Sequence, residues 1–185
     1  MKKALFLDRD GVINVEKDYV YRIEDFEFLD GIFELIRAAQ QADYLPIVIT
    51  NQSGIARGYY TEKAFQELTR WMIDEFLSRG ITIAKVYHCP FHPEAKLEIY
   101  KVDAWDRKPN PGMLLHAKSE FGLDLNRSIL VGDKESDMEA GRRAGVGRLV
   151  MLSEYSSLSS GNDIVSFETL KDITEFLFGH TVKPC

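Results

Sequence analysis

The sequence predicts an α/β fold with a doubly wound, mostly parallel sheet. Short apolar and β-branched runs alternate along the chain with longer segments whose apolar residues recur at helical spacing. This alternation is typical of parallel strands joined by crossover helices. Polar residues follow directly after several of the short runs, and ligands of such sheets bind beyond the carboxyl ends of the strands. We therefore expect one domain over residues 1–185, with a functional site at that edge.

The first half of the chain contains three predicted strands, at 4–7, 45–50 and 81–88. A first helix is predicted over 31–43. Thr61 can cap a second helix that runs to about residue 79, where Gly80 ends it. The apolar stripe of that helix consists of Phe65, Leu68, Met72, Phe76 and Leu77.

The second half begins with a loop over 89–109 that is rich in proline, histidine and charge. Asn110 and Pro111 then open a helix, as N-cap and first-turn proline. Strands are predicted at 128–131 and 148–152, with a helix at 136–144 between them. A serine-rich surface loop over 153–162 and a closing helix over 168–178 complete the chain.

Composition narrows the possible functions. The formal net charge of −6 over 185 residues argues against non-specific binding to nucleic acid or an anionic membrane. Two cysteines imply no disulfide framework, which fits a reducing cytoplasm. No apolar stretch approaches the ~20 residues that span a bilayer, and the N-terminal apolar run stops too early for a signal peptide.

Two acidic residues follow the first predicted strand, in Asp8-Arg9-Asp10-Gly11. Carboxylates so close together repel unless a cation neutralises them or one is protonated. Mg²⁺ favours carboxylate oxygens, and a carboxylate can be the nucleophile in phosphoryl transfer. An ordinary turn built from Asp and Gly explains the same residues, so this pair alone does not distinguish a functional site from a turn.

Polar residues also follow the later strands. Thr50 and the amides after it can donate to phosphate oxygens, or they can form a strand end with an Asx turn. Lys108 can offset charge on phosphate and carboxylate, or it can simply be solvated. Asp133 ends a buried strand and needs a partner such as a metal, although Asp133 or Ser136 could instead be an N-cap. Their common placement after four successive strands indicates one phosphate-handling site.

These features resemble the four signatures of the haloacid dehalogenase (HAD) superfamily of phosphatases, at 6–11, 48–51, Lys108 and 131–137. The resemblance implies that Asp8 attacks phosphorus, and that Asp10 protonates the leaving oxygen and then activates water. It implies that Mg²⁺ is held by Asp8, Asp133 and the backbone carbonyl of Asp10. Thr50 and Lys108 would stabilise the transferring phosphoryl group. Asp137 would orient Lys108 or a metal-bound water.

Within the superfamily, segments 8–14, 50–58 and 107–113 resemble the heptose-bisphosphate phosphatases, with histidinol-phosphate phosphatases as near relatives. This finer resemblance implies a set of substrate-binding residues. The sugar would contact Glu16, Lys17, Asp18 and Tyr19. The remote phosphate or hydroxyls would contact Asn51, Gln52, Ser53 and Arg107, and Lys134 would also bind substrate. A plain surface loop at 16–19 is the alternative.

The chain departs from many of these relatives in the loop after the third strand. They bind zinc there through a Cys-x-His pair and a later Cys-x-Cys pair. Here His92 is shifted by one position after Cys89, and residues 103–106 contain no cysteine. We therefore expect no structural zinc, although Asp103 or Asp106 could join a mixed site. We expect packing to hold this loop, through Phe91, Ile99, Tyr100 and Trp105.

The expected activity is Mg²⁺-dependent hydrolysis of a sugar bisphosphate by way of an aspartyl-phosphate. The resemblance points to D-glycero-D-manno-heptose 1,7-bisphosphate, which would lose its phosphate at carbon 7 and serve surface polysaccharide or lipopolysaccharide synthesis. Histidinol-phosphate phosphatase is the alternative enzyme, and a non-catalytic phosphosugar-binding protein is the alternative outside enzymes. The segments between the signatures are too short for a large cap domain. We expect a cytoplasmic monomer whose partner is a small sugar phosphate.

Overall fold

The computed structural model describes residues 1–153 and 164–179. Its sheet has the strand order β3-β2-β1-β4-β5-β6, and every pairing between these strands is parallel. The strands are β1 (Lys3–Leu7), β2 (Tyr44–Asn51), β3 (Lys85–Cys89), β4 (Ile129–Gly132), β5 (Arg148–Leu152) and β6 (Ile164–Phe167). The predicted doubly wound α/β fold is confirmed.

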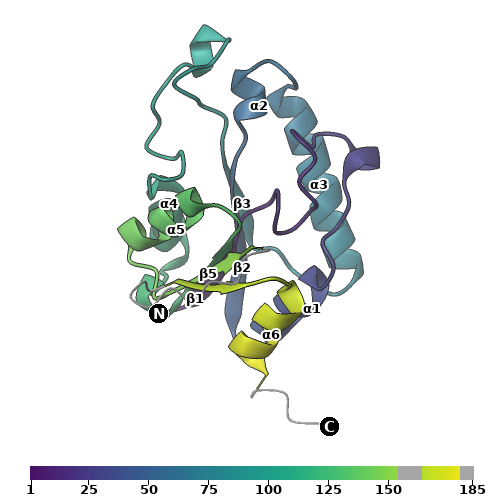
Figure 1. The fold of residues 1–185 in the computed structure, drawn as a ribbon, viewed down its shortest axis with the longest axis vertical. Helices are drawn as coiled ribbons and strands as arrows, with labels where there is room; N and C mark the ends of the chain where they lie inside the picture. The colour runs from purple at the N-terminus through teal and green to yellow at the C-terminus, as the bar shows by residue number, and fades with distance from the viewer. Residues whose placement is uncertain (154–163, 180–185) are drawn as a thin grey trace.

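Helices cover both faces of the sheet (Figure 1). On one side lie α4 and α5, and on the other lie α1, α3 and α6. The α-helices are α1 (Ile32–Gln41), α2 (Ser53–Ala56), α3 (Glu62–Ser78), α4 (Gly112–Phe121), α5 (Glu135–Ala144) and α6 (Leu170–Phe178). This layering follows from the crossover connections that parallel strands require.

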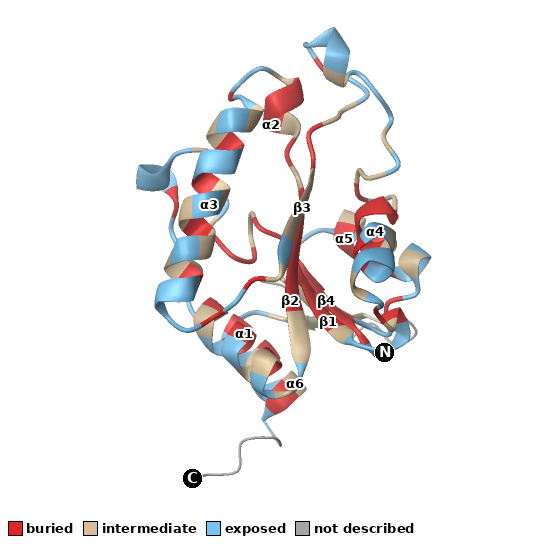
Figure 2. Cartoon of the chain, turned by 180° about the vertical axis from the view of Figure 1, so that it is seen from behind, coloured by how far each residue is buried: buried red, intermediate tan, exposed pale blue. Residues whose placement is uncertain are grey.

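Strand β1 divides its side chains between two hydrophobic clusters. Leu5 and Leu7 pack with the helices α1, α3 and α6, whereas Ala4 and Phe6 pack with α4 and α5. Alternate residues of a strand point to opposite faces, so a strand buried on both faces is apolar throughout. Figure 2 shows β1 and β4 as buried ribbons between the helical layers.

The long helix α3 begins and ends as the sequence predicts. The side chain of Thr61 accepts a hydrogen bond from the Ala64 amide at 3.1 Å. Gly80, with φ +72°, follows the end of the helix. The predicted stripe is buried except for Leu77, whose 60% exposure shows that its assignment to the core was wrong.

Some element boundaries differ from the prediction. The third strand begins only at Lys85, because Ile81 and Ile83 are buried in the core before the chain pairs with β2. The helix that was expected to have Asn110 as its N-cap has Pro111 there instead. Strand β6 was not predicted, and the closing helix begins after it, at Leu170. Most of the predicted serine-rich loop lies outside the described residues.

The loop between β3 and α4 is held differently from the prediction. Ile99 and Trp105 are 76% and 58% exposed, so the expectation that they pack the loop was wrong. Phe91 and Tyr100 do approach each other, with ring centroids 5.9 Å apart. Polar contacts add to this packing. The Tyr100 hydroxyl donates to Glu62 at 2.9 Å, and the Leu97 amide donates to the Ala56 carbonyl at 3.1 Å.

The connections that could have carried a cap domain are short. The segments between β1 and α1 and between β3 and α4 contain only the 3₁₀ turns Ile23–Asp25 and Glu98–Tyr100 as helical elements. Loops, and not a large cap domain, therefore surround the carboxyl edge of the sheet, as expected. None of the helices within residues 1–153 and 164–179 has the length and apolar character needed to cross a bilayer.

Candidate active site

Three adjacent strands bring the predicted catalytic side chains together. β1 lies between β2 and β4, so Asp8, Thr50 and Asp133 meet at the carboxyl edge of the sheet. Beside this edge is a cavity of about 600 Å³. Its lining consists of Asp8, Asp10, Glu16, Asp18, Tyr19, Thr50, Asn51, Gln52, Ser53, Tyr60, Arg107, Lys108, Pro109, Lys134, Ser136 and Asp137.

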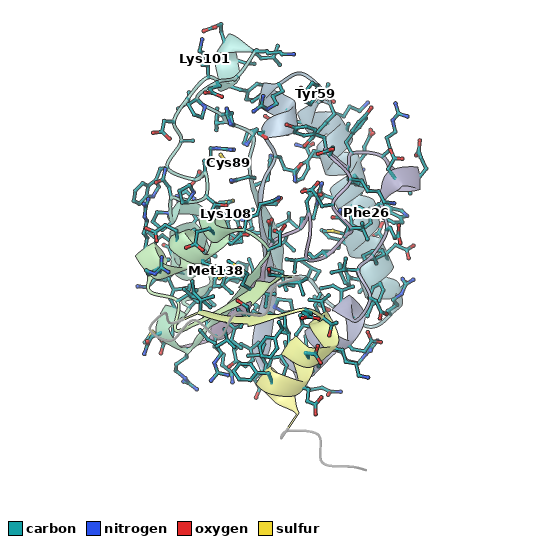
Figure 3. All side chains as sticks on the ribbon, viewed as in Figure 1. Phe26, Tyr59, Cys89, Lys101, Lys108 and Met138 are labelled. Atoms are coloured by element: carbon teal, nitrogen blue, oxygen red, sulfur yellow. The ribbon has the colours of Figure 1, made fainter. Side chains whose placement is uncertain are left out.

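Lys108 is buried between two carboxylates. Its Nζ lies 2.9 Å from Asp8 Oδ1 and 2.6 Å from Asp137 Oδ1, and it donates to the Ile49 carbonyl at 3.0 Å. Figure 3 places Lys108 at this edge of the sheet, below Cys89. The ammonium group is thus paired with two carboxylates and one carbonyl oxygen, which fixes the cation beside Asp8.

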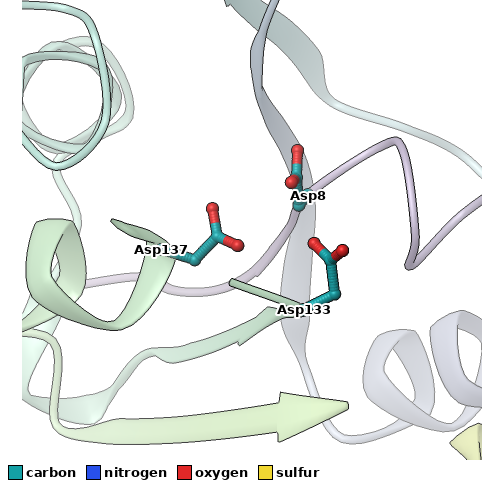
Figure 4. A group of neighbouring side chains, drawn as sticks. All are labelled: Asp8, Asp133 and Asp137. Carbon is teal, nitrogen blue, oxygen red and sulfur yellow. The ribbon is translucent and has the colours of Figure 1, made fainter. Parts of the chain in front are cut away.

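Asp8, Asp133 and Asp137 each offer one carboxylate oxygen, and these atoms lie within 4.8 Å of one another. The three side chains approach a common space (Figure 4). Asp133 Oδ1 is buried and has no hydrogen-bond partner. Carboxylate oxygens are the donors that Mg²⁺ prefers, so the donor set and the unpartnered oxygen both fit a hard divalent cation.

Asp137 differs from the other two acids in its contacts. Its Oδ1 faces Lys108 at 2.6 Å, and its Oδ2 accepts from the Lys134 amide at 3.0 Å, in the first turn of α5. One oxygen of Asp137 thus forms an ion pair with Lys108 and the other accepts a backbone hydrogen bond, whereas Asp133 Oδ1 has neither. Asp8 and Asp133 are therefore the acids of the cluster that could hold a cation.

Gly11 lets the backbone approach Asp133. It has φ +87°, and a Cβ atom placed there would lie 2.3 Å from Asp133 Oδ2. A side chain at residue 11 would therefore be strained and would displace that carboxylate. This close contact explains why a glycine follows Asp10 in the first signature.

Burial controls the protonation of the acidic cluster. It raises the pKa of Asp8 to about 7 in spite of Lys108, and it raises the pKa of Asp133 to about 6. Burial by itself would lower the pKa of Lys108, but Asp137 and Asp8 together raise it above its ordinary value. A cation bound between Asp8 and Asp133 favours their ionised forms, and ionisation is what a carboxylate nucleophile needs.

Asp10 is held by three side chains. Arg9, itself buried, donates from Nη2 to Oδ1 at 2.6 Å and to Oδ2 at 2.8 Å, and from Nε to Oδ1 at 3.2 Å. Asn14 Nδ2 donates to Oδ1 and Gln52 Nε2 donates to Oδ2, both at 3.1 Å. The carboxyl group lines the cavity in a defined orientation, so it can face a leaving group bound there.

The structure brings most of the predicted sugar-binding residues to the cavity. Glu16, Asp18, Tyr19, Ser53, Arg107 and Lys134 line it, and Lys134 Nζ lies 3.0 Å from Glu16 Oε2. Lys17 does not line it, because its Nζ pairs with Glu27 at 2.8 Å. Asn51 lines the cavity, but its amide exchanges two hydrogen bonds with the Lys108 backbone, at 2.9 and 3.0 Å.

Several site residues carried no assigned role in the sequence. Arg9 and Asn14 stand inside the first signature and hold Asp10, so their position was a usable signal. Ser136, which was weighed only as an N-cap, lines the cavity. Tyr60 also lines it, and only the folded structure shows that its hydroxyl meets Gln52.

Comparisons with known proteins identify the family of the chain. The HAD-hydrolase-like family model matches residues 106–172. The D-glycero-α-D-manno-heptose-1,7-bisphosphate 7-phosphatase of Burkholderia mallei is 56% identical over 152 residues, covering 82% of this chain and 80% of the relative. The chain belongs to this family of HAD-like phosphatases. A family member from Vibrio cholerae, named for the β anomer, is 40% identical over 179 residues, covering 95% of this chain and 96% of that one.

A solved structure of a family member supports the same fold. The D,D-heptose 1,7-bisphosphate phosphatase of B. bronchiseptica, complexed with magnesium and phosphate, superposes with a TM-score of 0.83. It is 26% identical, and the alignment covers 97% of this chain and 99% of that one. The chain is thus a phosphatase, and a member of its family has been seen with magnesium and phosphate bound.

Among the described residues, the acidic trio is the group of metal-ligating side chains that comes together. Cys89 is buried, with Sγ 4.0 Å from the Phe91 carbonyl, and the His92 ring accepts a hydrogen bond from the Glu94 amide at 3.0 Å. The expectation that the chain carries no structural zinc stays a prediction.

Proposed function

We propose that the chain hydrolyses D-glycero-α-D-manno-heptose 1,7-bisphosphate and releases the phosphate from carbon 7, through an aspartyl-phosphate on Asp8. The observation that carries this proposal is the position of Asp8. Its carboxylate lines a cavity of about 600 Å³ beside a fully engaged Lys108 and the acidic partner Asp133. A sugar phosphate fits a cavity of this size and polarity.

In the first step, an oxygen of Asp8 forms a bond to phosphorus while the bond between phosphorus and the carbon-7 oxygen breaks. Asp10 gives a proton to that leaving oxygen. Lys108 and Thr50 line the same cavity, where the positive charge of Lys108 and the hydroxyl of Thr50 can stabilise the negative charge on the transferring phosphoryl oxygens. The sugar leaves as the alcohol, and Asp10 is left ionised.

In the second step, Asp10 takes a proton from a water molecule as that water attacks phosphorus. The bond between Asp8 and phosphorus breaks, and inorganic phosphate leaves. Asp8, Asp133 and the backbone carbonyl of Asp10 are the groups that would hold Mg²⁺. When bound, Mg²⁺ supplies positive charge that offsets the carboxylates and the phosphoryl group.

The proposal of the α-heptose bisphosphate as substrate rests on the names of the relatives. Two relatives named for the α anomer are 56% and 50% identical to this chain, compared with 47% for a relative from Pasteurella multocida named for the β anomer. Glu16, Asp18 and Tyr19 line the cavity next to Asp10, where sugar hydroxyls would lie. We further propose that the chain acts as one catalytic domain and as a monomer in the cytoplasm.

A substrate panel tests this proposal. The purified chain with Mg²⁺ is assayed for phosphate release from α- and β-heptose 1,7-bisphosphate, fructose bisphosphate and histidinol phosphate. The α-heptose bisphosphate is expected to have a kcat/KM at least about tenfold above the others, with NMR showing loss of the phosphate at carbon 7. A preference for histidinol phosphate would assign the alternative enzyme. No turnover by a parent that binds the bisphosphate would indicate a binding protein.

A further inference from the structure

The side-chain amide of Gln52 is fully engaged within the protein. Its Nε2 donates to Thr50 Oγ1 at 2.8 Å and to Asp10 Oδ2 at 3.1 Å. Its Oε1 accepts from the Tyr60 hydroxyl at 2.5 Å. A glutamine amide has two N–H donors, and both are used here. Gln52 is also only 1% exposed, so its donors are not available to a sugar hydroxyl.

Gln52 joins two groups that the proposed reaction needs. Arg9 and Asn14 also hold Asp10, but they come from the loop that contains Asp10 itself. Gln52 instead follows β2, immediately beyond Thr50 and Asn51. Its Nε2 thereby sets the separation between the carboxyl group that transfers the proton and the hydroxyl that faces the phosphoryl group.

Tyr60 determines which way the Gln52 amide faces. Burial raises the pKa of Tyr60, so its hydroxyl stays a protonated donor to Oε1. If the amide turned over, Oε1 would face the Asp10 carboxylate, and two acceptors would lie against each other. The Tyr60 ring is itself held in place. It stacks on Tyr21 with centroids 5.1 Å apart, and a Cβ at Gly54 would lie 2.1 Å from its Cε1.

We propose that Gln52 and Tyr60 form a positioning pair that holds the Asp10 carboxyl group beside Thr50 for proton transfer to the leaving oxygen. The pair acts through Asp10 and does not touch the substrate with its amide donors. This inference rests on the proposed role of Asp10. It assigns Gln52 a role different from the direct substrate contact that the sequence resemblance implies.

Two substrates with different leaving groups can distinguish a misplaced Asp10 from a general loss of structure. A sugar alkoxide is a poor leaving group and needs a proton, whereas p-nitrophenolate leaves readily without one. A variant that misplaces Asp10 therefore slows the first step, formation of the aspartyl-phosphate, much more with the sugar phosphate than with p-nitrophenyl phosphate. The second step, in which Asp10 activates water, is the same for both substrates, so the first step is the one to compare. A variant that only loosens the fold slows both equally.

The test compares Tyr60→Phe and Gln52→Met with the parent on both substrates. We expect the rate of the first step, measured in a single turnover with the heptose bisphosphate, to fall about fivefold in Tyr60→Phe and about 50-fold in Gln52→Met, which is less than the roughly 10²–10⁴-fold of complete loss of proton transfer. KM should change by less than about twofold, and the burst of p-nitrophenolate should slow by less than about threefold. The double variant should be no slower than Gln52→Met, because the two residues act as one unit.

Tyr21→Phe is the matched control. It removes a tyrosine hydroxyl from the same aromatic cluster but leaves the ring that stacks on Tyr60, and it should behave as the parent on both substrates. A crystal structure of Tyr60→Phe gives a second measurement, in which the Gln52 amide or the Asp10 carboxyl group is expected to have moved.

Equal losses of the first-step rate on both substrates, a raised KM with an unchanged first-step rate, or unmoved Gln52 and Asp10 in the crystal would each overturn the positioning role. Asp10→Asn distinguishes this failure from failure of the proposed function. If Asp10→Asn spares the p-nitrophenolate burst and Tyr60→Phe has no such selectivity, only the positioning pair is wrong. If Asp10→Asn slows the first step equally on both substrates, the role of Asp10 as proton donor is wrong.

Discussion

Lys108 Nζ and Asp8 Oδ1 lie 2.9 Å apart in a place where both side chains are almost completely buried. The lysine follows the long loop after β3, and the aspartate follows β1, so the whole sheet edge must form before the two charges meet. Two buried charges are costly to separate from each other, because each loses water on burial. The catalytic arrangement is therefore also part of the folded core.

The first prediction concerns stability. Lys108→Met leaves Asp8 and Asp137 buried without their cation, and it should lower the free energy of unfolding by roughly 3–5 kcal/mol in EDTA. Urea unfolding measures this loss. Lys101→Met is the matched control, because Lys101 is exposed at the far end of the β3–α4 loop (Figure 3), and it should change stability by less than about 0.5 kcal/mol. Equal stability of Lys108→Met and the parent would mean that the buried pair contributes nothing.

The second prediction concerns pH in the absence of metal. Burial raises the pKa of Asp8 from 3.8 to about 7, so the folded protein binds more protons than the unfolded chain between these values. Stability should therefore fall as pH rises from about 4 to 7. Asp8→Asn cannot ionise at residue 8, so its stability should fall less than that of the parent over this pH range, by on the order of 4 kcal/mol.

Unfolding of both proteins in EDTA at pH 5 and at pH 8 tests this. The stability of the parent relative to Asp8→Asn should be greater at pH 5, where Asp8 of the parent is protonated. A stability difference between the two proteins that is the same at both pH values would contradict the role of Asp8 ionisation.

The third prediction concerns the metal. EDTA should abolish phosphate release, and Mg²⁺ should restore it. Mg²⁺ should also raise the melting temperature of the parent, since a ligand at about 100 times its Kd stabilises by about 2.7 kcal/mol. Asp133→Asn removes the acid whose Oδ1 has no partner, and it should lose this stabilisation. Glu135→Gln, which changes an exposed acid at the start of α5, should keep it.

The fourth prediction concerns proton transfer. Asp10→Asn keeps the shape of Asp10 but cannot exchange a proton, so kcat for the heptose bisphosphate should fall roughly 10²–10⁴-fold. Steady-state kinetics at saturating substrate provide the measurement. A kcat within a few-fold of the parent would remove Asp10 from the mechanism.

The sequence predicted which side chains would meet where strand ends determine positions. Asp8 and Asp133 follow buried parallel strands and Thr50 lies near the end of another, and the carboxyl ends of these strands share one edge of the sheet. The local sequence pattern did not predict strand boundaries correctly where contacts between distant residues determine them. Ile81 and Ile83 resemble a strand but are buried before pairing begins. Strand β6 is only half-buried and Ser166 interrupts its apolar run, so it lacks the pattern of the buried strands.

The same limit applies to side chains in the site. Nothing local to Tyr60 indicates that its hydroxyl meets Gln52, because that contact depends on how α2 turns after β2. Trp105 and Ile99 were expected to pack because they are large and apolar, yet both are exposed. Spacing identifies the reacting groups, but it does not show what holds them.

The central claim is that Asp8 becomes covalently phosphorylated. The direct test is to quench the enzyme in acid during turnover of the heptose bisphosphate, reduce it with sodium borohydride, and map the peptides by mass spectrometry. Acyl phosphates are reduced to alcohols under these conditions, so we expect the mass of a homoserine at residue 8 only when substrate and Mg²⁺ are present. An active enzyme whose Asp8 is never reduced, or whose reduction occurs at another acid, would contradict the account.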